Sequence, residues 1–155
     1  MSYDVVLFEP STTPRDRALF NAWFAKQTDW DDDHDYMDPA STTPALRNWY
    51  EVIRRDYPAM NGPDACDNGE ALDRSGDYNF GPDFIYITYP WSLAEEIYDR
   101  VRETAVQCRV GFYDVSGDDG DGEIYFPGDQ LRPPSQGTWR QIAADFRTGD
   151  LSKYI

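Results

Sequence analysis

The sequence predicts an α+β fold, a two-layer sandwich of about four strands with helices mainly on one face. Two observations carry this prediction. Short runs of β-branched and aromatic residues, at 3–8, 84–89, 110–115 and 123–126, are typical of strands. The segments between them include stretches whose apolar residues recur every three or four positions, as in amphipathic helices. The resulting order is β-α-α-β-α-β-β-α, and a length of 155 residues favours a single α+β domain over residues 1–155.

The N-terminal elements follow from two local patterns. Tyr3–Phe8 is a continuous apolar run and predicts a buried strand. A helix is expected after it, with Thr13 as N-cap, Pro14 in the first position and one apolar stripe over 19–24. We expect this helix to end near Thr28.

A second helix is expected after the same sequence motif recurs at Ser41–Pro44. Its apolar stripe covers 46–53, and Tyr57–Pro58 ends it. The next segment, 58–83, is rich in Pro, Gly, Asn and Asp and shows no period, which predicts a long loop.

The C-terminal half predicts two further helices and a hairpin. Phe84–Tyr89 is the clearest strand, and Ser92–Glu95 has the pattern of a capping box that opens a helix. The unit at 84–115 should be a parallel pair of strands joined by a right-handed crossover. A hairpin with a long tip follows, and residues 139–146 favour a last short helix.

The charge of the chain is concentrated in three predicted loops. The chain has 29 Asp and Glu against 14 Lys and Arg, so its formal net charge is −15. Residues 29–38 carry −6, residues 64–77 carry −4 and residues 114–123 carry −5, which leaves the rest of the chain neutral. Loops that all carry negative charge repel one another, and this repulsion destabilises the fold. A cationic partner or a metal ion would offset the repulsion.

This charge excludes several classes of function. A strongly acidic surface repels phosphate backbones and anionic membranes, so we expect no direct nucleic-acid binding and no membrane binding. No basic stretch followed by an apolar core opens the sequence, and Cys66 and Cys108 form no disulfide framework. We therefore expect a cytoplasmic location, and the sequence does not indicate the oligomeric state.

Aromatic residues beside the acidic runs suggest a protein-binding surface, with ring anchors inside a charged rim. Two ordinary explanations stand beside it: Asp is common in turns, and the rings could fasten the loops to the body of the protein. The candidate partner-binding residues are Asp31, Asp32, Asp33, Asp35, Trp30, Tyr36, Asp118, Asp119, Asp121 and Glu123.

The sequence predicts neither metal binding nor catalysis. The run at 31–35 offers carboxylates and one imidazole but matches no standard metal cage. The loop at 114–125 fails the EF-hand pattern, because Asp119 stands where glycine is needed and Tyr125 where the bidentate Glu is needed. His34 is the only histidine, and no nucleophile elbow, P-loop or dinucleotide motif occurs. We expect no cofactor and no metal; an enzyme or a divalent-metal module using the Asp loops is the second alternative.

Four segments carry a resemblance to a known group: Tyr3–Pro10, the two Thr-Thr-Pro helix starts, Pro58–Pro63 and Gly111–Val115. They resemble uncharacterised small acidic bacterial proteins of the kind encoded beside polymorphic toxins, the immunity proteins. This resemblance implies a protein that binds one cognate toxin and blocks its active site or assembly, and it carries over no site residues. The charge of the chain is consistent with this function, because acidic loops would steer a basic toxin toward the protein electrostatically. The first alternative is a nucleic-acid-mimicking inhibitor of a DNA- or RNA-binding protein.

One expectation concerns how the acidic loops are arranged. If the strand at 84–89 runs antiparallel to the first strand, loop 29–38 and the hairpin tip at 116–122 should share one end of the sheet. They would then form a single acidic surface, which the distance from Asp32 to Asp119 would test.

Overall fold

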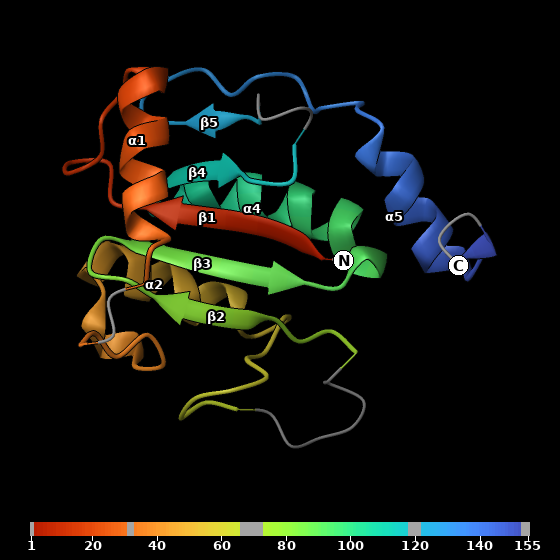
Figure 1. Cartoon of the computed structure of the whole chain (residues 1–155), viewed down its shortest axis with the longest axis horizontal. Helices are drawn as coiled ribbons and strands as arrows, with labels where there is room; N and C mark the ends of the chain where they lie inside the picture. Colours follow the sequence, from red (N-terminus) through yellow and green to blue (C-terminus); the bar gives the residue numbers. More distant parts are fainter. Residues whose placement is uncertain (1, 31–32, 66–72, 118–121, 153–155) are drawn as a thin grey trace.

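In the computed structural model, which describes residues 2–30, 33–65, 73–117 and 122–152, five strands form one antiparallel sheet. Its order is β2-β3-β1-β4-β5 (Figure 1). The strands are β1 (Tyr3–Phe8), β2 (Asp77–Phe80), β3 (Phe84–Tyr89), β4 (Gly111–Asp114) and β5 (Ile124–Tyr125). The predicted α+β fold is confirmed, and β2 is an additional strand within the segment expected to be a loop.

The central position of β1 corrects the expected pairing of the 84–115 unit. β3 and β4 both pair with β1 in antiparallel fashion, so they run parallel to each other with β1 between them. They are therefore not neighbours, and the crossover through α4 (Ala94–Cys108) passes over β1. An apolar run that is buried on both sides, as Tyr3–Phe8 is, suits this central position.

Alternate residues of β1 separate two cores. Val5 and Leu7 belong to the larger core, which lies under α2 (Pro44–Ile53), α4 and α5 (Trp139–Thr148). Val6 and Phe8 point to the other face, where they pack in a smaller core with α1 (Arg17–Gln27). The helices thus lie mainly on one face, as predicted, and α1 is the helix that covers the opposite face.

The helix α1 crosses the strands instead of returning along β1 (Figure 1). Near its start the ring of Phe20 lies 5.1 Å from that of Tyr113 on β4, and near its end Phe24 stacks 6.2 Å from Tyr86 on β3. The helix therefore leads the chain from the β4 side of the sheet to the β3 side. This crossing decides where the first acidic loop lies.

The predicted start of α1 is wrong by three residues. Its N-cap is Asp16, whose carboxylate accepts a hydrogen bond from the amide of Leu19 at 3.1 Å. Thr13 is not available as a cap because its hydroxyl donates to the carbonyl oxygen of Glu9 at 2.7 Å. Pro14 consequently lies before the helix.

The other two predicted helix starts have opposite outcomes. Thr43 caps α2, with Pro44 in the first position, as predicted. The capping box at Ser92–Glu95 is wrong, because a 3-10 turn, η2 (Trp91–Leu93), precedes α4 and its N-cap Leu93 makes no side-chain hydrogen bond. A further 3-10 turn, η1 (Pro39–Ser41), ends the first acidic loop.

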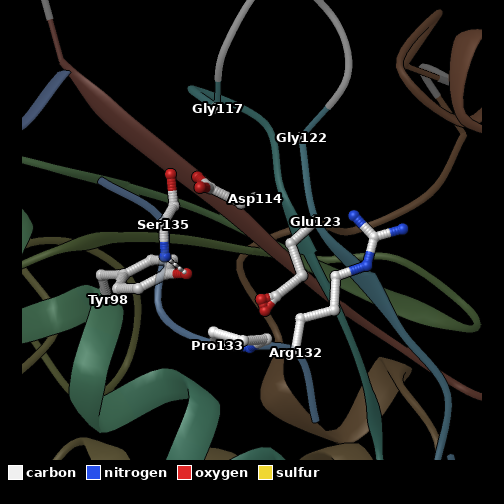
Figure 2. Close-up of a pocket in the computed structure, with 8 residues that line it drawn as sticks. All are labelled: Tyr98, Asp114, Gly117, Gly122, Glu123, Arg132, Pro133 and Ser135. Carbon is white, nitrogen blue, oxygen red and sulfur yellow. Dashed lines mark hydrogen bonds between the residues drawn. The ribbon is translucent and has the colours of Figure 1, made fainter. Parts of the chain in front are cut away.

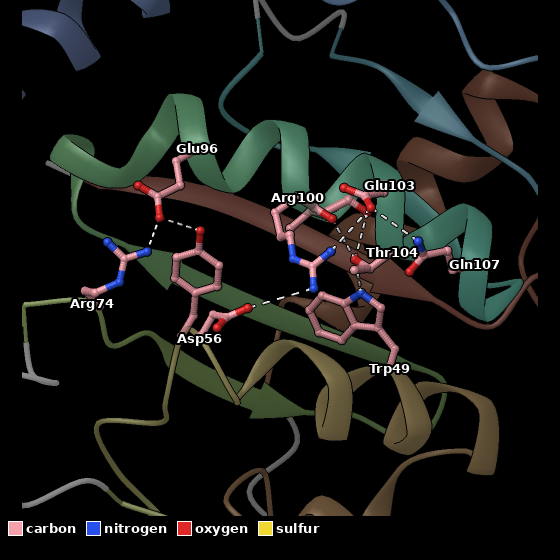
Figure 3. A network of polar contacts seen from close by, with 10 residues as sticks. Trp49, Asp56, Arg74, Glu96, Arg100, Glu103, Thr104 and Gln107 are labelled. Atoms are coloured by element: carbon pink, nitrogen blue, oxygen red, sulfur yellow. Dashed lines mark hydrogen bonds and ion pairs between the residues drawn. The ribbon is translucent and has the colours of Figure 1, made fainter.

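Polar contacts fasten α4 to α2 and to the long loop (Figure 3). The indole nitrogen of Trp49 donates to the buried hydroxyl of Thr104 at 2.9 Å. The carboxylate of Glu96 accepts a hydrogen bond from the Tyr57 hydroxyl at 2.6 Å and also pairs with Arg74. Since Tyr57 and Arg74 come from either end of the 58–73 stretch, these bonds close the long loop onto α4.

Candidate functional site

The first acidic loop, residues 29–38, is anchored where β2 ends and β3 begins. The amide of Phe80 donates to the carbonyl oxygen of Tyr36 at 2.8 Å. The Nε2 atom of His34 lies 2.7 Å from the carbonyl oxygen of Phe80, so this nitrogen carries the proton and donates it. The single histidine therefore holds the loop on the sheet.

Trp30 is the most unusual residue of this loop. Its backbone adopts a left-handed conformation, with φ of 52°, which costs an L-residue roughly 1–2 kcal/mol. Its ring meets that of Tyr36 edge-on at 5.0 Å and lies 5.7 Å from Tyr86. The side chain is nevertheless 38% exposed, and Met37 beside it is 37% exposed. The strained backbone therefore holds a supported but accessible indole at the surface.

Exposed carboxylates surround this indole. Asp29, Asp33, Asp35 and Asp38 are exposed, whereas Asp31 and Asp32 lie outside the described residues. The carboxylates of Asp35 and Asp38 each accept one local backbone amide, from Met37 at 3.0 Å and Ala40 at 2.9 Å. These bonds shape turns, as the ordinary explanation for loop Asp requires. Within the described parts of the chain, however, Asp29, Asp35 and Asp38 form no ion pair, so their charge remains available to a partner.

The candidate residues of the hairpin do not join this surface. Asp118, Asp119 and Asp121 lie outside the described residues. Glu123 is buried, and its two oxygens lie 3.0 Å and 3.2 Å from Nε of Arg102. Placing Glu123 on an exposed binding surface is therefore wrong: its charge is used inside the protein. The sequence signal for such a partner was the spacing of Arg102, which stands four residues after Tyr98 on the buried side of α4.

The expected single acidic surface is also wrong for the described flanks of the two loops. The strands at 3–8 and 84–89 are antiparallel, as that expectation required. The hairpin, however, adjoins the start of β1, where the Asp4 amide donates to the Ser116 hydroxyl at 2.9 Å. Loop 29–38 adjoins the end of β1, because Phe84, beside the Trp30 ring, pairs with Phe8. The length of a six-residue strand, about 20 Å, separates them. The reason is the transverse course of α1.

In the acidic loop 64–77, Asp64 and Asp77 are used internally, whereas Asp73 is exposed. Asp64 accepts a hydrogen bond from the Tyr50 hydroxyl at 3.0 Å and lies 3.6 Å from Arg54. Asp77 accepts one from the Asn61 amide at 2.6 Å. Among the described residues, loop 29–38 therefore combines several exposed carboxylates with an exposed aromatic anchor, Trp30.

A polar pocket of about 160 Å³ lies under the hairpin (Figure 2). The Glu123 carboxylate turns toward the Tyr98 hydroxyl, which accepts a hydrogen bond from the Ser135 amide at 2.8 Å, and Asp114 lines the same pocket. Burial raises the pKa of Glu123, although Arg102 and Arg132 act against the shift. A carboxyl of raised pKa could exchange a proton with a ligand. Here its bond to Arg102 ties α4 to the hairpin, so we interpret this pocket as a structural joint.

Glycine is required at the wall of this pocket. A Cβ atom on Gly122 would lie 1.9 Å from the carbonyl oxygen of Asp114. One on Gly117 would lie 2.7 Å from the Cα atom of Gly122. The two arms of the hairpin therefore approach closely above Asp114.

Other reactive groups give no site in the described part of the chain. No cluster of three or more His, Cys, Asp or Glu there is arranged to hold a metal ion. Cys66 lies outside the described residues, and burial raises the pKa of the Cys108 thiol at the end of α4. None of the described helices has both the length and the apolar character that crossing a membrane requires.

Comparison with known proteins identified no relative of this chain. No protein-family model matches the chain, and no curated protein or solved structure shows significant similarity to it. The resemblance to immunity proteins therefore stays a prediction, and the functional argument depends on the geometry of the surface.

Proposed function

We propose that this chain is a protein-binding module of the cytoplasm, an immunity protein that binds and neutralises a basic toxin through loop 29–38. One observation carries the proposal: an exposed tryptophan is held in a left-handed backbone conformation among exposed carboxylates. Conformational strain in a bulky residue persists where the surrounding structure enforces it, and such strain clusters at functional sites.

The surface has the composition of a binding hot spot. Tryptophan and tyrosine are the residues most enriched at energetic centres of interfaces, and a polar rim around them excludes water. Trp30 is braced by Tyr36 and by the sheet, so its ring loses little freedom when a partner covers it. A partner would therefore gain apolar contact area without having to order the anchor.

The exposed carboxylates would increase the rate of association and the selectivity for a cationic partner. Asp29, Asp35 and Asp38 lie on the surface without ion pairs inside the described structure, and the whole chain carries −15. Such a surface accelerates encounter with a cationic protein and rejects acidic ones. A nuclease toxin, whose active site must bind phosphates, presents the required positive cleft.

The alternative, a nucleic-acid mimic, has less support. A mimic needs carboxylates repeated along a face at phosphate-like intervals. The described carboxylates Asp64, Asp77 and Glu123 are instead bound within the protein. An aromatic anchor also has no counterpart on a phosphate backbone, whereas it suits a protein interface.

Co-purification with the product of the neighbouring open reading frame tests the proposal, with dissociation constants measured at low and high salt. We expect a tight complex whose association slows with salt. Trp30→Ala should weaken it at least about 30-fold, as hot-spot truncations do. Asp35→Asn should mainly slow association. Asp99→Asn, on the exposed side of α4, is the matched control and should change neither rate.

Two results would contradict the proposal. One is the absence of a salt-sensitive complex with a toxin-like neighbour. The other is a complex that Trp30→Ala leaves as tight as the wild type. Binding that depends on the carboxylates but not on Trp30 would favour the mimic.

A further inference from the structure

A pocket of about 200 Å³ adjoins the Trp30 surface, between the end of α1 and the turn that joins β2 to β3. Tyr36 belongs to both features, because its ring contacts that of Trp30 and also lines the pocket. The lining residues are Lys26, Gln27, His34, Tyr36 and Pro82. We call this cavity the Tyr36 pocket.

Two half-buried side chains of the Tyr36 pocket keep hydrogen-bonding atoms that the described structure does not use. Since Nε2 of His34 donates to the carbonyl oxygen of Phe80, the neutral imidazole has a lone pair on Nδ1. No described residue donates to this Nδ1 atom, and within the same residues the side-chain amide of Gln27 forms no hydrogen bond. A ligand that donates hydrogen bonds would therefore find acceptors already in place.

The pocket also has an aromatic wall. The ring of Tyr36 meets that of His34 edge-on at 4.6 Å and that of Trp30 edge-on at 5.0 Å. Tyr36 is thus held by rings that come before it in the same loop. Aromatic faces attract cations, and a planar guanidinium stacks on them better than an ammonium group does.

The charge around the pocket selects a cation over an anion. Residues 26–38 contain six aspartates and one lysine. Asp29 and Asp35 are exposed, and neither forms an ion pair in the part of the chain that the structure describes. Lys26 opposes them, but it is exposed, and a long side chain of this kind keeps its ammonium group in water. A carboxylate in the pocket would be repelled by the surrounding aspartates, whereas a guanidinium would be attracted.

We propose that the Tyr36 pocket receives an arginine side chain of the basic partner, beside the contact made by Trp30; the identity of that partner rests on the proposed function. A guanidinium carries several N–H donors in one plane, so it donates to more than one acceptor while its face lies on a ring. The cavity is smaller than the roughly 300–1,000 Å³ of drug-sized sites, which suits a single side chain. Two adjacent anchor points, one aromatic and one for a cation, would fix the orientation of the partner.

Titration with a short arginine peptide tests the pocket without a toxin. The probe is acetyl-Gly-Arg-Gly-amide, and two comparison peptides replace its arginine with lysine or with citrulline, which has nearly the same shape but no charge. The readout is the NMR signals of the Gln27 side-chain amide and of the ring of His34, the only histidine. Spectra are recorded at about pH 8, where imidazole is ordinarily neutral. We expect saturable shifts with the arginine peptide at millimolar concentration, and dissociation constants several-fold higher for the two comparison peptides.

Two substitutions in the pocket have opposite expected effects. Gln27→Leu removes an acceptor at similar size and should weaken binding of the arginine peptide about fivefold. Lys26→Gln removes the competing cation and should strengthen it several-fold, a gain that high salt should reduce. Gln107→Leu makes the same change as Gln27→Leu on the exposed side of α4, so it is the matched control. It should leave the dissociation constant unchanged.

The proposal would be overturned if the arginine peptide gives no saturable shifts, or if either comparison peptide binds as tightly. Unchanged binding by Gln27→Leu, with an intact fold by circular dichroism, would also overturn it. Failure of the pocket and failure of the proposed function are distinguishable. Peptide binding without any toxin complex would contradict the proposed function alone, whereas a Trp30-dependent toxin complex without peptide binding would contradict the pocket alone.

Discussion

The Nε atom of Arg102 lies 3.0 Å and 3.2 Å from the two carboxylate oxygens of Glu123, and both side chains are more than nine-tenths buried. This pair joins the middle of α4 to the residue that precedes β5. The same arginine also donates to the carbonyl oxygen of Arg132. One buried cation therefore holds the edge strand and the segment after it against the larger core.

Breaking this pair should be costly, and replacing both partners should not. Glu123→Leu leaves a buried guanidinium without its carboxylate, so we expect a loss of roughly 3–5 kcal/mol in the free energy of unfolding. The double variant Arg102→Met/Glu123→Leu should recover most of this loss, because no buried charge remains. Urea unfolding of the two single variants and the double variant measures the coupling. A double variant as unstable as the sum of the singles would contradict the prediction.

The backbone of Trp30 gives a second prediction, about stability and not binding. Trp30→Ala and Trp30→Gly both remove the ring, but glycine adopts the left-handed conformation without a steric penalty. The glycine variant should therefore be more stable than the alanine variant by about 1 kcal/mol. At an ordinary right-handed position the order would be reversed, since glycine costs entropy. Urea unfolding of the matched pair decides between the two orders.

The regular elements could be predicted where one physical signal dominated. The continuous apolar runs of β1 and β3 are the interior strands of the sheet, and the stripes of α2 and α4 face the larger core. β2 was missed because Asp77 and Asn79 resemble turn residues. The contacts that hold β2 come from distant parts of the chain. The Tyr78 hydroxyl forms hydrogen bonds with the Tyr89 hydroxyl at 2.8 Å and with the carbonyl oxygen of Tyr57 at 2.6 Å.

The sequence indicated which residue types form the candidate site, but it did not indicate how these residues are arranged in space. Aromatic residues beside acidic ones indicated Trp30 and Tyr36, and the structure brings their rings to 5.0 Å. Glu123 was misplaced because its own acidic run does not indicate burial; the signal lay in Arg102, far along the chain on α4, whose pairing with Glu123 depends on the tertiary fold.

The close approach at Gly122 gives a third prediction. Gly122→Ala would bring a methyl carbon to 1.9 Å from the Asp114 carbonyl oxygen, a backbone atom that cannot rotate away. We expect a loss of about 2 kcal/mol or more, as for other overpacked positions, with hydrogen exchange accelerating first in β4 and β5. An alanine variant with unchanged exchange at Asp114 and Tyr125 would contradict this reading of the hairpin.

The ion pair of Glu96 gives a prediction about pH. Burial raises the pKa of this carboxyl, but hydrogen bonds from Tyr57 and Arg74 outweigh burial, so the pKa lies below its usual value. A lowered folded-state pKa means that the carboxylate stabilises the fold fully above the unfolded pKa of about 4.3, and that this stabilisation is lost as pH falls through the folded value. Glu96→Gln should therefore cost about 1 kcal/mol at pH 7, since the side chain is 44% exposed and solvent screens the pair.

That difference from the wild type should shrink as the pH falls below about 4, where the wild-type carboxylate takes up its proton. Asp99→Asn on the same helix is the control, because within the described structure Asp99 forms no ion pair, and its effect should stay near zero at every pH. Urea unfolding of the wild type and both variants between neutral pH and about pH 3 measures the two curves. A Glu96→Gln difference that is constant over this range, or that grows on acidification, would show that the carboxylate is not held by Tyr57 and Arg74 in the way the geometry requires.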